Sequence, residues 1–239
     1  MTDSEYFDSI YRRKERVAGT DRVRSKSESI APMVFGLKSI SQRGFSTLSL
    51  FDPPGEGVIQ ERDVERFHQF VFKSHGLVLL VDGENLAKDD KSGGSFKEAI
   101  KVLQVASSQL EADRSWTNRL RPFLAIAVSK ADLLFGLQDM PAQAFTSPSY
   151  DQGYDWDDFR IVSSGVEALI RRRGGSNFCN LAQAVFGEDR VGFFAVSAFG
   201  SAPDERTGKI TTLKPLRVVD PFLWLMSKTG VLSTIGGPS

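Results

Sequence analysis

Three short, uninterrupted apolar runs constrain the fold of this chain more than any other feature of its sequence. They are residues 77–81 (LVLLV), 123–128 (FLAIAV) and 191–196 (VGFFAV). Runs of this length without polar alternation are typical of strands buried on both faces, as in a parallel sheet. Stretches with apolar residues at helical spacing lie between them. The sequence therefore predicts an α/β fold: a doubly wound, mostly parallel sheet flanked by helices.

The helices that should flank this sheet can be placed by their caps and spacing. Ser95 and Glu98 form a capping-box pattern at the start of one helix. A second helix is predicted over residues 157–173 and should end at Gly174 and Gly175. Further helices are predicted at about 57–73, near 181–186 and at 221–228, whereas residues 82–92 are predicted to form a polar loop.

An antiparallel hairpin is predicted ahead of the parallel strands. Residues 32–38 and 45–51 both carry β-forming residues and are joined by a short polar reversal. We expect this hairpin to form one edge of the sheet. The chain then divides into a polar N-terminal segment (1–30), one domain (31–230) with an insertion at about 133–188, and a loose tail (231–239).

Composition excludes several functional classes. The 239 residues carry a formal net charge of +0, which argues against nucleic acid as a partner. One cysteine and two histidines leave no room for a disulfide within the chain and argue against structural zinc. No apolar run approaches the roughly 18 residues of a membrane span, so a cytoplasmic protein is expected. The aspartates of an acidic patch are predicted to be solvated surface: Asp151, Asp155, Asp157 and Asp158.

Three polar segments follow predicted strands directly. They are residues 52–56 (DPPGE), 129–132 (SKAD) and 197–198 (SA). Ligands of doubly wound sheets bind beyond the carboxyl ends of the strands. The shared placement of the three segments therefore predicts one binding site.

In this order the segments resemble the third, fourth and fifth motifs of a P-loop GTPase of the translation-factor-related (TRAFAC) class, most like the double-GTPase domains of bacterial conflict and signalling systems. The resemblance implies GTP and Mg²⁺ as ligands. It implies that Asp52 holds Mg²⁺ and that the Gly55 amide meets the γ-phosphate. Glu56 stands where many such enzymes carry the glutamine that orients the attacking water, so Gly55 and Glu56 are the candidate catalytic residues.

The same resemblance implies a guanine site at the next two strand ends. The Asp132 carboxylate would accept two hydrogen bonds from guanine, with the Lys130 stem along the base. Ser129 replaces the usual asparagine or threonine at the first position of this motif. Ser197 and Ala198 would form the rim of the base site.

The phosphate-binding loop of such a GTPase is missing from this chain. The pattern G-x-x-x-x-G-K-[ST] is not matched, and the nearest approach, at Gly208 and Lys209, follows the last strand. The chain is therefore expected either to begin late or to belong to a degenerate lineage, with little or no hydrolysis on its own. Loss of the first strand would expose sheet edges and invite partner pairing. Thr20 is a further candidate Mg²⁺ ligand by position alone.

Three functions remain open at this point. The main prediction is a GTP-binding switch domain with guanine nucleotide as partner, seen here without its N-terminal part. The alternative is a pseudo-GTPase scaffold or protein-interaction module in a bacterial signalling or conflict system, with a protein partner. A third interpretation is an unrelated doubly wound domain, in which Asp52, Asp132 and Ser197 would not converge on one cleft.

Overall fold

The computed structural model describes residues 33–38, 45–50, 74–88, 94–112, 121–138, 140–151, 153–202, 204, 206–207, 209–210, 213–232 and 234–236. Its centre is a parallel sheet of three strands, β3 (Gly76–Asp82), β4 (Phe123–Ser129) and β6 (Val191–Ala195). The order of these described strands is β3-β4-β6. The three apolar runs thus form neighbouring parallel strands, which confirms the predicted α/β architecture.

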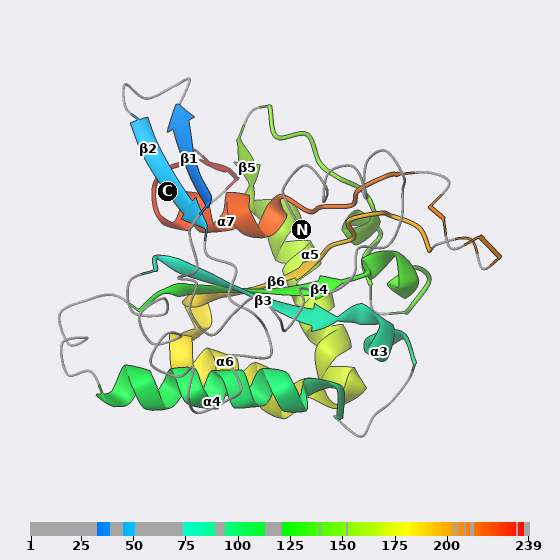
Figure 1. Cartoon of the computed structure of the whole chain (residues 1–239), viewed down its shortest axis with the longest axis horizontal. Helices are drawn as coiled ribbons and strands as arrows, with labels where there is room; N and C mark the ends of the chain where they lie inside the picture. Colours follow the sequence, from blue (N-terminus) through cyan, green and yellow to red (C-terminus); the bar gives the residue numbers. More distant parts are fainter. Residues whose placement is uncertain are drawn as a thin grey trace.

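Helices cover both faces of this sheet (Figure 1). Helices α4 (Lys97–Ala112) and α6 (Ser176–Phe186) pack on one face, and α7 (Asp220–Lys228) packs on the other. Helix α5 (Trp156–Ile170) runs beside β6, so that its first turns reach the α7 face and its last turns reach the α4 face. The central strand β4 is consequently buried from Leu124 to Val128.

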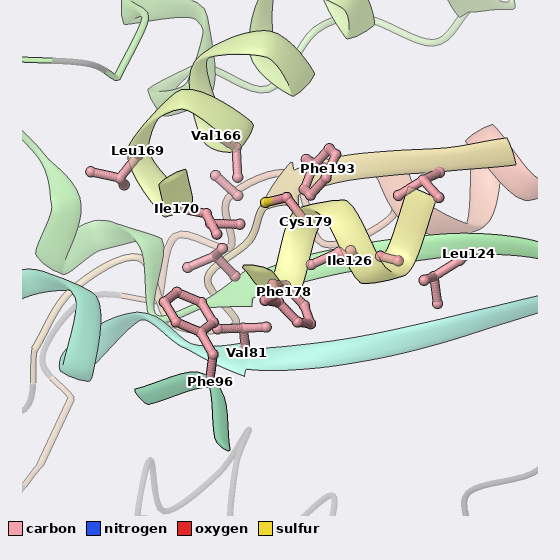
Figure 2. Close-up of a cluster of buried hydrophobic side chains, with 14 of the residues drawn as sticks. Val81, Phe96, Leu124, Ile126, Val166, Leu169, Ile170, Phe178, Cys179 and Phe193 are labelled. Atoms are coloured by element: carbon pink, nitrogen blue, oxygen red, sulfur yellow. The ribbon is translucent and has the colours of Figure 1, made fainter. Parts of the chain in front are cut away.

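The main core lies between the sheet and the helices α4 and α6 (Figure 2). Phe96 and Phe178 stack with their ring centroids 5.2 Å apart, and Cys179 is enclosed beside them. A second, aromatic core lies under α7, where Phe159, Phe194 and Trp224 pack on the small side chains of β4. Phe96 is buried in the main core, together with three side chains of α4: Leu103, Ala106 and Leu110.

Two elements differ from the sequence prediction. Helix α3 (Gly83–Ala87) occupies the start of the predicted polar loop, because the Asp82 side chain caps its first turn. Helix α6 begins at Ser176, five residues before the predicted position. The helical path breaks at Gly174, whose φ of 82° is left-handed, and a new helix starts immediately afterwards.

The predicted hairpin is present as β1 (Met33–Lys38) and β2 (Phe45–Leu50), paired antiparallel. The prediction that it forms an edge of the parallel sheet is not supported, because β1 and β2 make a separate two-stranded sheet. Pairing of two strands far apart in the chain depends on contacts that local sequence patterns do not record.

The remaining elements are short. The 3₁₀ turns are η3 (Gly94–Phe96), η5 (Ala131–Leu134), η6 (Ala142–Phe145) and η8 (Glu188–Arg190), and η7 (Arg171–Gly175) is a π turn. Strands β5 (Tyr154–Asp155) and β7 (Thr234–Ile235) pair in parallel and tie the C-terminal segment to the start of α5.

Candidate functional site

Polar side chains gather where the three parallel strands end. Asp82 ends β3 and Glu84 follows it, Lys130 and Asp132 follow β4, and Ser197 follows β6. The structure therefore brings the described parts of the predicted motifs to one edge of the sheet, which we call the carboxyl edge.

Lys130 is the charged centre of this edge. Its Nζ lies 3.1 Å from Asp82 Oδ1 and 2.9 Å from Glu84 Oε2. The hydrogen bond from Lys130, followed by that from Lys88, lowers the pKa of Glu84 to about 2. The pKa of Lys130 is raised, chiefly by its hydrogen bond to Glu84. The ammonium is thus neutralised by carboxylates of the same chain, rather than directed toward an open site.

Asp82 and Glu84 were missed in the sequence because they were assigned to a loop. Their position is fixed by a close backbone approach: a Cβ on Gly83 would lie 2.1 Å from the Ser129 carbonyl oxygen, so only glycine fits there. Asp82 Oδ1 accepts from the Glu84 amide at 3.1 Å, which caps α3. The polar residues directly after the apolar run were the available signal.

Asp132 and Ser197 are in contact, as the predicted convergence requires. Ser197 Oγ donates to Asp132 Oδ1 at 2.5 Å and accepts from the Gly200 amide at 2.9 Å. The Ser197 backbone pairs with Leu216 in both directions, at 3.0 and 2.8 Å. The buried hydroxyl is therefore fully engaged in holding two loops together, while neighbouring Ala198 is exposed.

The other predicted site residues are less informative. Ser129 Oγ donates to the Val81 carbonyl at 3.2 Å, which links two strand ends. Asp52, Gly55, Glu56 and Thr20 lie outside the described residues, so their roles stay predictions. Among the residues that the structure describes, no group of three or more His, Cys, Asp or Glu side chains is arranged to hold a metal ion.

Beside the carboxyl edge, a buried arginine makes a clamp that sequence reasoning missed. Arg217 is only 3% exposed and has a left-handed φ of 50°. Its Nε donates to Asp220 at 2.7 Å, and its guanidinium also pairs with Asp158. The same group donates to the carbonyls of Gln143 and Thr146 at 2.8 and 2.9 Å.

This Arg217 clamp corrects part of the prediction that the acidic patch is solvated surface. Burial alone disfavours the charged guanidinium, but its hydrogen bond to Asp158 and the charge of Asp220 outweigh that effect and raise its pKa. Asp155 also has a structural role, since its carboxylate caps α5 through the amides of Asp157 and Asp158 at 2.9 and 3.1 Å. Asp158 and Asp155 therefore organise the chain internally, the first through a buried cation 59 residues away in sequence, whereas Asp151 and Asp157 are exposed as predicted.

Apolar side chains are exposed on the loops that the clamp and Ser197 hold together. Phe135 is 75% exposed and meets Phe145 edge-on, with ring centroids 5.1 Å apart. The exposed members, which we call the apolar loop end, are Leu133, Phe135, Val218 and Val219. Exposed apolar side chains are a feature of protein-binding surfaces when they are contiguous.

Comparison with known proteins gives one partial match. The chain is 32% identical over 128 residues to "Putative ESX-1 scaffolding and assembly protein SaeC" of Mycolicibacterium smegmatis. The match covers 47% of this chain and 33% of the relative, so the chain spans about a third of that protein's length. No family model matches the chain, and no solved structure matches it.

These findings overturn the resemblance to a P-loop GTPase. The relative is named for scaffolding and assembly, and no GTPase family or structure matches. The main prediction, a GTP-binding switch domain of the double-GTPase type, is therefore wrong. Its motifs are two to five residues long, and their polar residues are the types that cap helices and close turns after parallel strands. Guanine nucleotide and Mg²⁺ were implied only by that resemblance and remain without support.

The alternative, a protein-interaction module, fits the comparison better.

No helix in the described part of the chain is both long and apolar enough to cross a membrane.

Proposed function

We propose that this chain is a protein-interaction module that acts as a scaffold in assembling an ESX-type secretion system. The single observation that carries the proposal is the 32% identity to SaeC over 128 residues. The chain corresponds to about a third of that relative, so the proposal concerns one module of a scaffold rather than its whole activity.

The geometry supports binding to a protein more than binding to a small charged ligand. The charged groups at the carboxyl edge are paired with one another, and the Ser197 hydroxyl already has two hydrogen-bond partners. The apolar loop end next to them is exposed, and Phe135 is its most exposed member. Large exposed aromatic side chains are frequent anchors of protein interfaces.

The proposal can be tested by crosslinking in cells. A tagged chain would be expressed in M. smegmatis, crosslinked in the living culture, purified, and its partners quantified by mass spectrometry. We expect ESX-1 components to be enriched over an untagged culture, and Phe135→Ser to lower that enrichment about tenfold or more, as loss of an interface anchor does.

The matched control is Ile161→Ser, since Ile161 is also an exposed apolar residue but lies on α5. This variant should retain the enrichment. A wild-type chain that enriches no ESX-1 component would contradict the proposed function.

A further inference from the structure

Strand β3 is an end strand of the parallel sheet, and none of the strands that the structure describes pairs with its outer side. Residues 77–81 are all apolar, with no charge and no proline among them. Natural edge strands usually carry charged residues or proline, because an edge strand without them can pair with a strand of another chain. An apolar run of this kind is typical of a strand in a parallel sheet that is covered on both faces.

Hydrogen bonds show which backbone groups of β3 face that edge. The His75 carbonyl accepts from the Phe123 amide at 3.0 Å, and the Val81 carbonyl accepts from Ser129 Oγ at 3.2 Å, so these odd-numbered residues face β4. Successive residues of a strand direct their N–H and C=O groups to opposite sides. The residues that present theirs to the open edge are Gly76, Val78, Leu80 and Asp82.

The opposite edge of the sheet is covered. Ser163 of α5 accepts a hydrogen bond from the Phe193 amide of β6 at 3.0 Å, and α5 lies along that strand. No described strand pairs with β3 on its outer side. One edge of the sheet is thus covered by α5, whereas the other has no described strand beside it. This difference points to a partner at β3.

The side chains of β3 are exposed on the same side. Val78 and Leu80 are 37% and 66% exposed, although their sheet neighbours Ala125 and Ala127 are buried under α7. Leu77 and Leu79 point to the opposite face and pack against the main core. An apolar strip therefore continues the α7 face of the sheet up to its open edge.

We propose that β3 pairs antiparallel with β3 of a second copy of this chain, on a two-fold axis at Leu79. In this register Val78 lies opposite Leu80 of the second copy and exchanges both backbone hydrogen bonds with it, since both residues face the edge. Leu79 lies opposite Leu79 of the second copy as a non-hydrogen-bonded pair. The result is one continuous six-stranded sheet.

A second copy fits this edge for three reasons. The register overlaps β3 with itself over its full seven residues. It sets each exposed apolar side chain against another, and it keeps the two Asp82 carboxylates at opposite ends of the paired strands. The described strands β1 and β2 do not occupy the outer side of β3, because they form a separate two-stranded sheet. This inference stands on β3 alone and does not depend on the proposed function.

Disulfide trapping on the full chain tests the register. Two cysteines at position 79 would have Cα atoms about 4.5 Å apart in the paired strands, within the range of a disulfide. We expect Leu79→Cys to form a covalent dimer on mild oxidation. Leu80→Cys should not, because residue 80 is two positions out of register with its own copy. The native Cys179 is buried and contributes no background.

Light scattering on the unmodified chain provides a second test that does not alter the half-buried Leu79. At about 100 μM the wild-type chain should have twice the 26.4 kDa mass of one copy. Leu80→Lys should be monomeric, because it places an exposed charge at the pairing edge, and Phe135→Lys should remain dimeric. A monomeric wild type, a dimeric Leu80→Lys, or trapping through position 80 as efficient as through 79 would each overturn the proposal. A monomer would assign this edge to another segment of the chain or to a different protein.

Discussion

Lys130 sits in the left-handed backbone region, and its ammonium is shared between two acidic side chains from the β3–α3 turn. Exposed ion pairs of this kind contribute little to folding. Their consequence is a change in pKa: Glu84 and Lys130 both remain charged over a wider pH range than they would alone.

The Glu84 carboxyl should therefore titrate near pH 2, well below its usual 4.5. Lys130→Met should raise this pKa more than Lys88→Met does, because the Lys130 hydrogen bond is the larger cause. Carboxyl carbon NMR across a pH series would measure both shifts. Equal shifts in the two variants would contradict the assignment.

The sign of the linked stability effect follows from the same shift. A folded-state pKa below the unfolded value stabilises the fold above about pH 4.5, and this contribution is lost as the pH falls toward 2. Because Glu84 is exposed, solvent keeps the effect small.

Cys179 should be chemically inert in the folded chain. Burial raises the pKa of its thiol from 9.0 to about 12, which leaves roughly a thousandfold less thiolate at pH 8. Iodoacetamide should therefore modify the thiol in denaturant and leave it intact under native conditions, as followed by intact-mass spectrometry. Comparable rates in the two conditions would show that the main core opens freely.

At the scale of elements, the Arg217 clamp links the loop around η6, the start of α5 and the start of α7. Tyr150 adds a further hydrogen bond to Asp220, and burial, followed by this hydrogen bond, raises the pKa of its hydroxyl. The aspartates depend on one cation, so its removal would leave buried charge without a partner.

Arg217→Met should accordingly lower the free energy of unfolding by about 3–5 kcal/mol. The control is Arg160→Met, which removes the exposed pair with Asp157 and should cost less than about 1 kcal/mol. Urea unfolding at one fixed protein concentration would compare the two variants. Similar losses would mean that the clamp is no stronger than a surface pair.

The sequence predicted the strands and helices better than it predicted the contacts between them. The runs of β3, β4 and β6 were recognisable because strands buried on both faces need no polar alternation. The Asp158–Arg217 pair was not, since its members are 59 residues apart and each looks like an ordinary surface residue in local sequence. The separation of the hairpin from β3 was missed for the same reason: strand adjacency is a long-range property.

The candidate site was predictable in position and not in chemistry. Strand order alone brought Asp132 and Ser197 together, because parallel strands end at a common edge. The contacts of Lys130 and Ser197 were decided by Asp82, Glu84 and Gly200, which the short motifs do not include.

At the scale of the whole molecule, two exposed apolar features lie on different parts of the surface. The apolar loop end belongs to the loops beyond β4 and before α7, and the β3 edge belongs to the sheet itself. The first is our candidate for partner binding and the second for self-association. A chain with both could join several partners through one dimer, as a scaffold requires.

The central claim is that the chain acts as one module of a secretion scaffold, and export from M. smegmatis tests it most directly. The chain would be produced at the level of SaeC, and proteins exported through ESX-1 would be quantified in the culture filtrate. Because the chain spans a third of SaeC, we predict that it occupies the partners of SaeC without replacing the rest of that protein, so export falls. Phe135→Ser should leave export unchanged. The account would be contradicted if the wild-type chain left export unchanged. It would also be contradicted if the wild-type chain and the Phe135→Ser variant lowered export equally.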